Sequence, residues 1–194
     1  MQPHFGFARR VGPIERSSDL QTEIMPVKAQ TQIDWDEVFT TASPVIPVCL
    51  SGIGWICFLK NKQQLEWYEK VKVPSWYTKN PFIVAPLDLA TFAPVGYAAT
   101  VVYREGQGPD RQLALGLYGA GLLVWLVGIP AYAKVKDLKC WFGIMALASG
   151  IFGATAAAFY KIDNNAGLML VPLTAWLGYQ AAGFAAAIQS NPDL

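Results

Sequence analysis

The chain has 194 residues, of which 53% are hydrophobic and only 15% are charged, a composition too apolar for an ordinary soluble domain. Its 15 basic and 14 acidic residues give a net charge of +1, so no overall basic field favours binding to nucleic acid. His4 is the only histidine and lies outside every apolar segment, which excludes an intramembrane bis-histidine haem or histidine-rich metal site. The composition therefore predicts an integral membrane protein without a metal site.

Charged segments divide the sequence into five apolar blocks of about 18 to 23 residues, the length that a helix needs to cross a hydrocarbon core. The blocks are residues 42–59, 81–103, 112–133, 140–160 and 166–188. Only helices and closed barrels satisfy the backbone in lipid, and the blocks lack the ten-residue alternating pattern of barrel strands. The pattern predicts an all-α membrane protein, a bundle of five transmembrane helices.

The same boundaries give the domain organisation. Residues 1–41 are expected to form a polar N-terminal extension, residues 42–189 the five-helix domain, and residues 190–194 a short C-terminal tail. Loops rich in lysine and arginine face the cytoplasmic side of a membrane. The loop 60–80 and the C-terminus are therefore expected on the same, more positive side, because eight lysines follow the first and third blocks: Lys60, Lys62, Lys70, Lys72, Lys79, Lys134, Lys136 and Lys139.

Asp88 is the only acidic residue well inside an apolar block. An acid near the middle of a membrane helix costs roughly 2.5 to 3.5 kcal/mol on insertion scales, so its side chain should face the bundle interior. Two interpretations stay open here. Asp88 is either a polar anchor or proton site in a pocket, or a neutral acid bonded to a carbonyl group freed by Pro86 or Pro94.

Three segments carry a resemblance to a known family: "LEWYEKVKVPSW" at residues 65–76, "APLDLATFAPVGY" at residues 85–97, and "PLTAWL" at residues 172–177. The chain resembles the translocator protein (TspO/MBR) family over about residues 47–188. The resemblance implies a five-helix fold with an interior pocket for flat apolar ligands, such as tetrapyrroles or sterols. Asp88 departs from the family pattern, which usually has tryptophan there.

The candidate ligand-binding residues are aromatic or polar side chains of the apolar blocks and the first loop, namely Trp76, Asp88, Tyr97, Phe159, Trp176 and Gln180. Aromatic faces suit flat ligands, and the resemblance places Trp176 on the pocket helix. Trp67, Tyr68, Trp76 and Trp141 also fit an interfacial aromatic belt near the block ends. No nucleophile and base pattern predicts a catalytic site, and the resemblance alone leaves porphyrin degradation open.

Two functions follow as hypotheses. The first is a ligand-binding or transport protein that requires no cofactor, with a tetrapyrrole, sterol or lipid as its candidate occupant. The second is a non-catalytic accessory subunit of a large respiratory or photosynthetic complex. In either case the expected partners are membrane lipids and a homodimer or larger membrane complex, and the expected location is an organellar membrane, mitochondrial rather than plastid.

Overall fold

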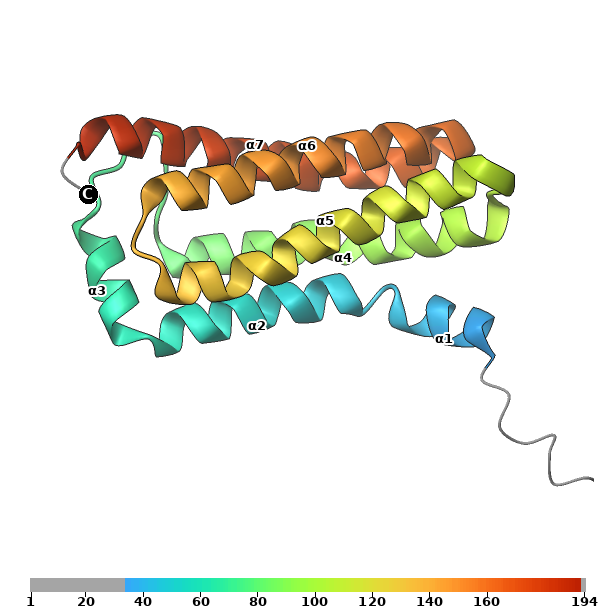
Figure 1. The fold of residues 1–194 in the computed structure, drawn as a ribbon, viewed down its shortest axis with the longest axis horizontal. Coiled ribbons are helices and arrows are strands. Elements are labelled where there is room, and N and C mark those ends of the chain that lie inside the picture. The colour runs from blue at the N-terminus through green and yellow to red at the C-terminus, as the bar shows by residue number, and fades with distance from the viewer. Residues whose placement is uncertain (1–33, 193–194) are drawn as a thin grey trace, which may run out of the picture. The chain divides into compact units, whose positions relative to one another are not determined.

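The computed structural model describes residues 34–192, and these residues form seven α-helices and no strand (Figure 1). The all-helical prediction is confirmed for this part of the chain. Most of the expected extension, residues 1–33, lies outside the described residues. The helices are α1 (Trp35–Ala42), α2 (Ile46–Lys60), α3 (Lys62–Lys70), α4 (Pro81–Glu105), α5 (Gly108–Lys134), α6 (Leu138–Ile162) and α7 (Asn164–Ser190).

Four of these helices, α4 to α7, are long and apolar enough to cross a membrane, and a fifth span is formed only if α1 and α2 are counted as one broken span. The two short helices are bent by 45° at the break. Pro44 lies in the break, and Pro47 occupies the first turn of α2, where its missing N–H removes no helical hydrogen bond. The first span thus differs from the continuous helix expected at residues 42–59.

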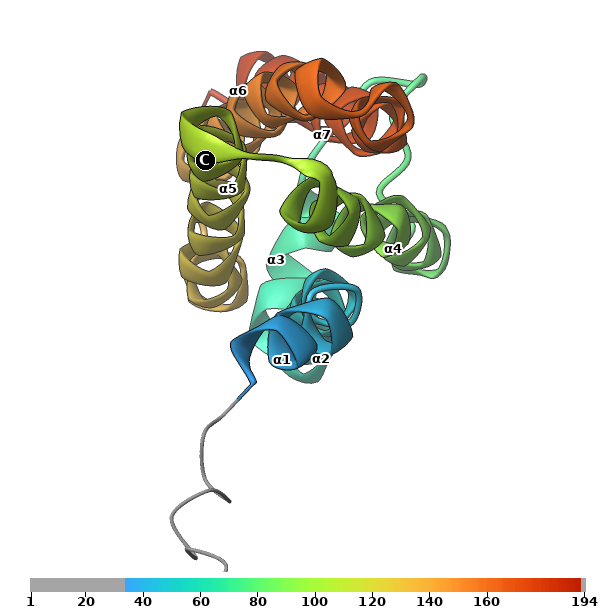
Figure 2. The same ribbon diagram turned by 90° about the vertical axis from the view of Figure 1, so that its right-hand side faces the viewer.

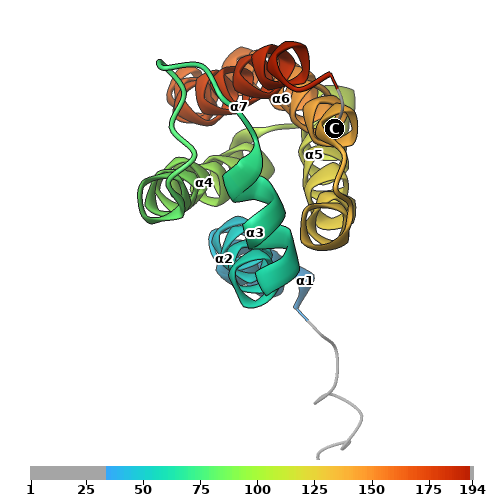
Figure 3. The same ribbon diagram turned by 90° about the vertical axis from the view of Figure 1, so that its left-hand side faces the viewer.

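The long helices and α2 are arranged in a ring. Going round it, α2 packs on α4, α4 on α7, α7 on α6, α6 on α5, and α5 back on α2 (Figure 2). The short helix α3 lies across the end of the bundle where α2 ends (Figure 3). The ring encloses an interior, and α3 with the following loop covers one end of it.

The break in the first span is held against α4 at Gly96. The Ser43 hydroxyl donates to the Gly96 carbonyl oxygen at 3.2 Å, and a methyl group at Gly96 would overlap the carbonyl oxygen of Ser43. The Tyr118 hydroxyl, from α5, donates to the same Ser43 oxygen at 3.5 Å. Close backbone approach through a small residue is a common way to pack membrane helices, and here it fixes where the first span bends.

The outer surface of the ring is apolar. Phe82 is 83% exposed and Val127 is 69% exposed, and both lie on helices long enough to cross a membrane. Contiguous apolar surface of this kind is unfavourable in water and suits contact with lipid.

The arrangement of helix ends gives a test of topology. Gln107 precedes α5, and Ser190 ends α7, at opposite ends of the bundle (Figure 1). Gln107→Cys and Ser190→Cys, each in a background without the three native cysteines, are expected to react with a membrane-impermeant maleimide from opposite sides of sealed vesicles. Labelling of both positions from one side would contradict the predicted five-span topology.

Candidate ligand-binding cavity

A cavity of about 70 Å³ lies inside the ring, between α3 and the middle of the long helices. Every helix except α1 contributes to its wall. Most of the wall is aromatic, from Trp55, Phe58, Tyr68, Tyr77, Trp125, Tyr132, Trp141 and Phe184. Such a wall offers aromatic side chains for contact with a flat ligand, together with several polar groups.

Asp88 is the acidic group of this cavity. It is 3% exposed, and the indole N–H of Trp55 donates to its Oδ2 at 2.6 Å, while the indole N–H of Trp176 donates to Oδ1. The side chain thus faces the bundle interior, as the insertion cost of an acid predicts. Its partners are indoles from α2 and α7, however, and not the carbonyl groups near Pro86 or Pro94 that the sequence suggested.

The loop after α3 closes one end of the cavity through Tyr77. The Tyr77 hydroxyl donates to Gln180 Oε1 at 2.6 Å, and its ring stacks on Tyr179 with centroids 5.4 Å apart. The backbone N–H of Thr78 donates to the Tyr179 hydroxyl at 3.1 Å. These contacts fasten the loop to α7, so Tyr77 forms part of the cavity wall.

A second attachment involves the C-terminal end of α7. The Asn191 side chain accepts from the Lys72 N–H at 3.0 Å and donates to the Lys72 carbonyl oxygen at 2.8 Å. This pair of bonds resembles the pairing of two peptide groups and holds the start of the loop beside the C-terminus.

The covering segment, α3 and the loop at residues 71–80, contributes Tyr68 and Tyr77 to the cavity wall, and both remain neutral phenols. Burial raises the pKa of Tyr68 to about 12, and burial raises the pKa of Tyr77 still further. A buried phenolate would lose its hydration without gaining a cationic partner, so the protonated form is favoured. Both hydroxyls therefore keep their protons at neutral pH, and Tyr77 uses its proton in the hydrogen bond to Gln180.

Two further polar groups in the wall have no protein partner. Ser51 and Trp125 line the cavity, and the Ser51 hydroxyl and the Trp125 indole N–H are buried and make no hydrogen bond. A buried polar group without a partner costs about 1 to 3 kcal/mol. A ligand that carries a hydrogen-bond acceptor would recover part of that free energy.

The six residues proposed from sequence are distributed unevenly. Asp88 and Gln180 line the cavity, and Trp176 lies behind Asp88 as its hydrogen-bond donor. Trp76 and Tyr97 are 53% and 55% exposed, and Phe159 is fully buried in the core against Tyr118. The structure therefore does not bring all six to one place, and a role in ligand binding stays a prediction for each.

Trp141 was expected in an interfacial belt, and this expectation is wrong. It is 2% exposed, lines the cavity and donates its indole N–H to the Val135 carbonyl oxygen at 3.0 Å. The outward face of its helix, with Phe142 and Leu147, is apolar as well, so apolar periodicity does not separate the two faces. The buried positions of α6 follow a strict alternation of three and four residues: Leu138, Trp141, Met145, Ala148, Phe152, Thr155 and Phe159.

Sequence reasoning also missed Trp55, Tyr77 and Tyr132 as wall residues. Tyr77 lies outside every apolar block, and its place in the wall depends on contacts with residues about a hundred positions later in the chain.

Among residues 34–192, no group of three or more histidine, cysteine, aspartate or glutamate side chains is arranged to hold a metal ion.

Comparisons with known proteins agree with this architecture. The model of the TspO/MBR family matches residues 45–188. The chain is 27% identical to the translocator protein of Sus scrofa over 119 residues, which cover 60% of this chain and 70% of the relative. It is 26% identical to the translocator protein of Homo sapiens, over 63% of this chain and 76% of the relative. It is 30% identical to translocator protein 2 of Canis lupus familiaris, over 66% of this chain and 75% of the relative. The chain is an integral membrane protein that belongs to the TspO/MBR family.

Proposed function

We propose that this protein binds, and passes through its interior, flat apolar ligands of the tetrapyrrole or sterol class, without catalysing their conversion. The observation that supports the proposal best is the aromatic cavity inside the helix ring. The names of the relatives add weight, because several are called translocator proteins. An organellar membrane, mitochondrial rather than plastid, is the proposed location.

The size of the cavity sets a condition on this function. Pockets for drug-sized ligands occupy roughly 300 to 1,000 Å³, whereas this one occupies about 70 Å³. A tetrapyrrole or sterol therefore requires the covering segment to move. The movable part is α3 and the loop, because Tyr68 and Tyr77 reach the cavity from there. The loop is attached to α7 by a few hydrogen bonds and by the stacking of Tyr77 on Tyr179.

A direct titration tests the proposal. Purified full-length protein in lipid nanodiscs is expected to bind a porphyrin or a sterol saturably with one site per chain, read by quenching of tryptophan fluorescence for the porphyrin and by calorimetry for the sterol. Asn191→Ala removes the attachment at Lys72 and should speed ligand association several-fold, whereas Ser190→Ala, next to it and exposed, should not. Absence of saturable binding to either ligand class would refute the proposal.

The accessory-subunit function is a second candidate, favoured by two observations. The cavity is small, and Gly116, Gly119, Gly143 and Gly150 have open space beside them, on α5 and α6, where a helix of another protein can approach closely. Size-exclusion chromatography of mildly solubilised native membranes separates the two functions. Migration as a monomer or dimer supports the ligand-binding function, and co-migration with a large complex supports the subunit function.

A further inference from the structure

The cavity combines one acid with an aromatic wall and contains no base. Asp88 is its only acidic group, and its wall includes no lysine, arginine or histidine. The carboxyl group is nine-tenths buried or more, so its negative charge, when present, has no water to stabilise it. A buried carboxylate in such a place normally has a paired cation or keeps a proton.

The hydrogen bonds to Asp88 suit a carboxylate that accepts a further partner. One indole N–H donates to each oxygen, and each carboxylate oxygen can accept about two hydrogen bonds. One acceptor position on each oxygen is therefore left for another donor. Since Asp88 lines the cavity, a donor located in the cavity can reach it.

The aromatic side chains supply the second half of a cation site. A cation near the face of an aromatic ring is attracted by the ring quadrupole, by about 2 kcal/mol or more when the site is desolvated, and tryptophan is the strongest such partner. Trp55, Trp125 and Trp141 all line this cavity, together with three tyrosines. Aromatic rings beside an anionic group are suited to recognising organic ammonium groups.

We propose that the cavity binds an amine carried on a compact apolar or aromatic frame, as an ammonium ion paired with the Asp88 carboxylate. This inference rests on the proposed ligand-binding function and adds amines to the ligand classes proposed there. The unpaired Ser51 hydroxyl and Trp125 N–H point to a hydrogen-bond acceptor elsewhere on the same ligand.

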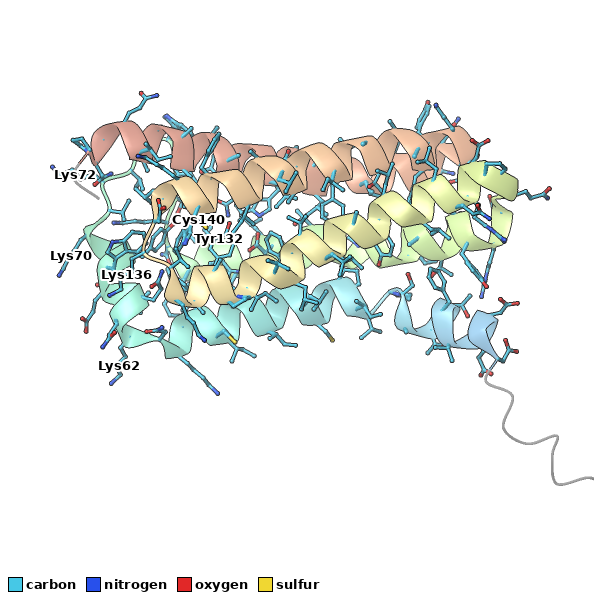
Figure 4. All side chains as sticks on the ribbon, in the orientation of Figure 1. Lys62, Lys70, Lys72, Tyr132, Lys136 and Cys140 are labelled. Atoms are coloured by element: carbon cyan, nitrogen blue, oxygen red, sulfur yellow. The ribbon has the colours of Figure 1, made fainter. Side chains whose placement is uncertain are left out.

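The charge at the bundle end indicates how such a ligand enters. Lys62, Lys70, Lys72 and Lys136 lie at the end of the bundle covered by α3 (Figure 4), where lysines outnumber the acids Glu66, Glu69 and Asp137. Their positive charge disfavours entry of an ammonium ion at that end. The ligand therefore enters as the neutral amine and takes the proton of the Asp88 carboxyl group, which leaves an ammonium–carboxylate pair and no change in net charge.

A matched pair of probes tests the inference. N,N-dimethylbenzylamine and isobutylbenzene have nearly the same shape and differ by one nitrogen, which is basic in the amine. Ligand-observed NMR with the full chain in nanodiscs is expected to give an affinity at least tenfold higher for the amine at neutral pH. Asp88→Asn should remove this preference, and Asp110→Asn, an exposed acid at the start of α5, should keep it.

The outcomes separate the two levels of the argument. Equal affinity for both probes, or a preference that persists in Asp88→Asn, overturns the amine inference and leaves the ligand-binding function standing. If neither probe binds while a porphyrin or sterol binds, the amine inference is again overturned and the ligand-binding function again stands. If none of the probes, porphyrins or sterols binds, both the amine inference and the proposed ligand-binding function are refuted. The comparison of the two probes in the unmodified protein decides the question even where Asp88→Asn does not fold.

Discussion

Ser51→Leu is expected to abolish ligand binding and at the same time make the protein more stable. Ser51 is buried on α2 and faces the cavity with an unpaired hydroxyl. Leucine removes that polar group and fills the space. At about 24 cal/mol per Å³, filling a cavity of about 70 Å³ stabilises the fold by up to about 1.7 kcal/mol. Ligand titration and thermal unfolding of the same samples measure both effects.

The control for this substitution lies two residues away on the same helix. Ile53 is half exposed and faces outward, so Ile53→Leu should leave both binding and thermal stability close to those of the unmodified protein. Stabilisation by Ser51→Leu with undiminished ligand affinity would show that ligands bind somewhere other than this cavity.

Gly96→Ala is expected to destabilise the bundle by up to about 2 kcal/mol. The added methyl group overlaps backbone atoms of Ser43 and Pro44. Because backbone atoms cannot turn aside as a side chain can, α4 must move away from the break between α1 and α2. Overpacking of this kind costs about 1 to 3 kcal/mol. The gain of up to about 1 kcal/mol in helix propensity offsets only part of it. The measurement is unfolding in mixed detergent micelles.

The matched control is Gly116→Ala on α5. Nothing lies within 4 Å of a methyl group built at Gly116, so only the change in helix propensity remains, which favours the variant by up to about 1 kcal/mol. If Gly96→Ala lowers the stability and Gly116→Ala raises it, the contact with Ser43 is the cause of the destabilisation. If Gly96→Ala leaves the stability unchanged, the break between α1 and α2 can move away from α4 without cost.

The parts of the fold that follow from local pattern are predictable from the sequence. The four helices from Pro81 to Ser190 match the apolar blocks because block length and charged boundaries decide membrane helices. The break at residues 43–45 was not anticipated, since prolines in a membrane helix are compatible with either a kink or a break. Nor was α3, a short polar helix whose Tyr68 is fixed by tertiary contact.

The candidate site was less predictable than the fold, for a physical reason. Asp88 was identified because a buried acid is costly wherever it occurs. The direction of an aromatic side chain depends instead on which face of its helix meets a neighbour, and proximity to a block end favoured an interfacial place for Trp141. In the structure Trp141 belongs to the buried face of α6, whose positions repeat every seven residues.

The attachment of the loop to α7 also has a consequence in time. The loop at residues 71–80 is synthesised early, but its partners Gln180 and Asn191 follow 103 and 119 residues later. At about 5 to 20 residues per second, the ribosome needs roughly 5 to 20 s to make the intervening chain. During that interval the loop lacks its hydrogen bonds to Gln180 and Asn191. A ligand present in the membrane during synthesis can therefore be enclosed as the last helix docks, without any later opening of the finished protein.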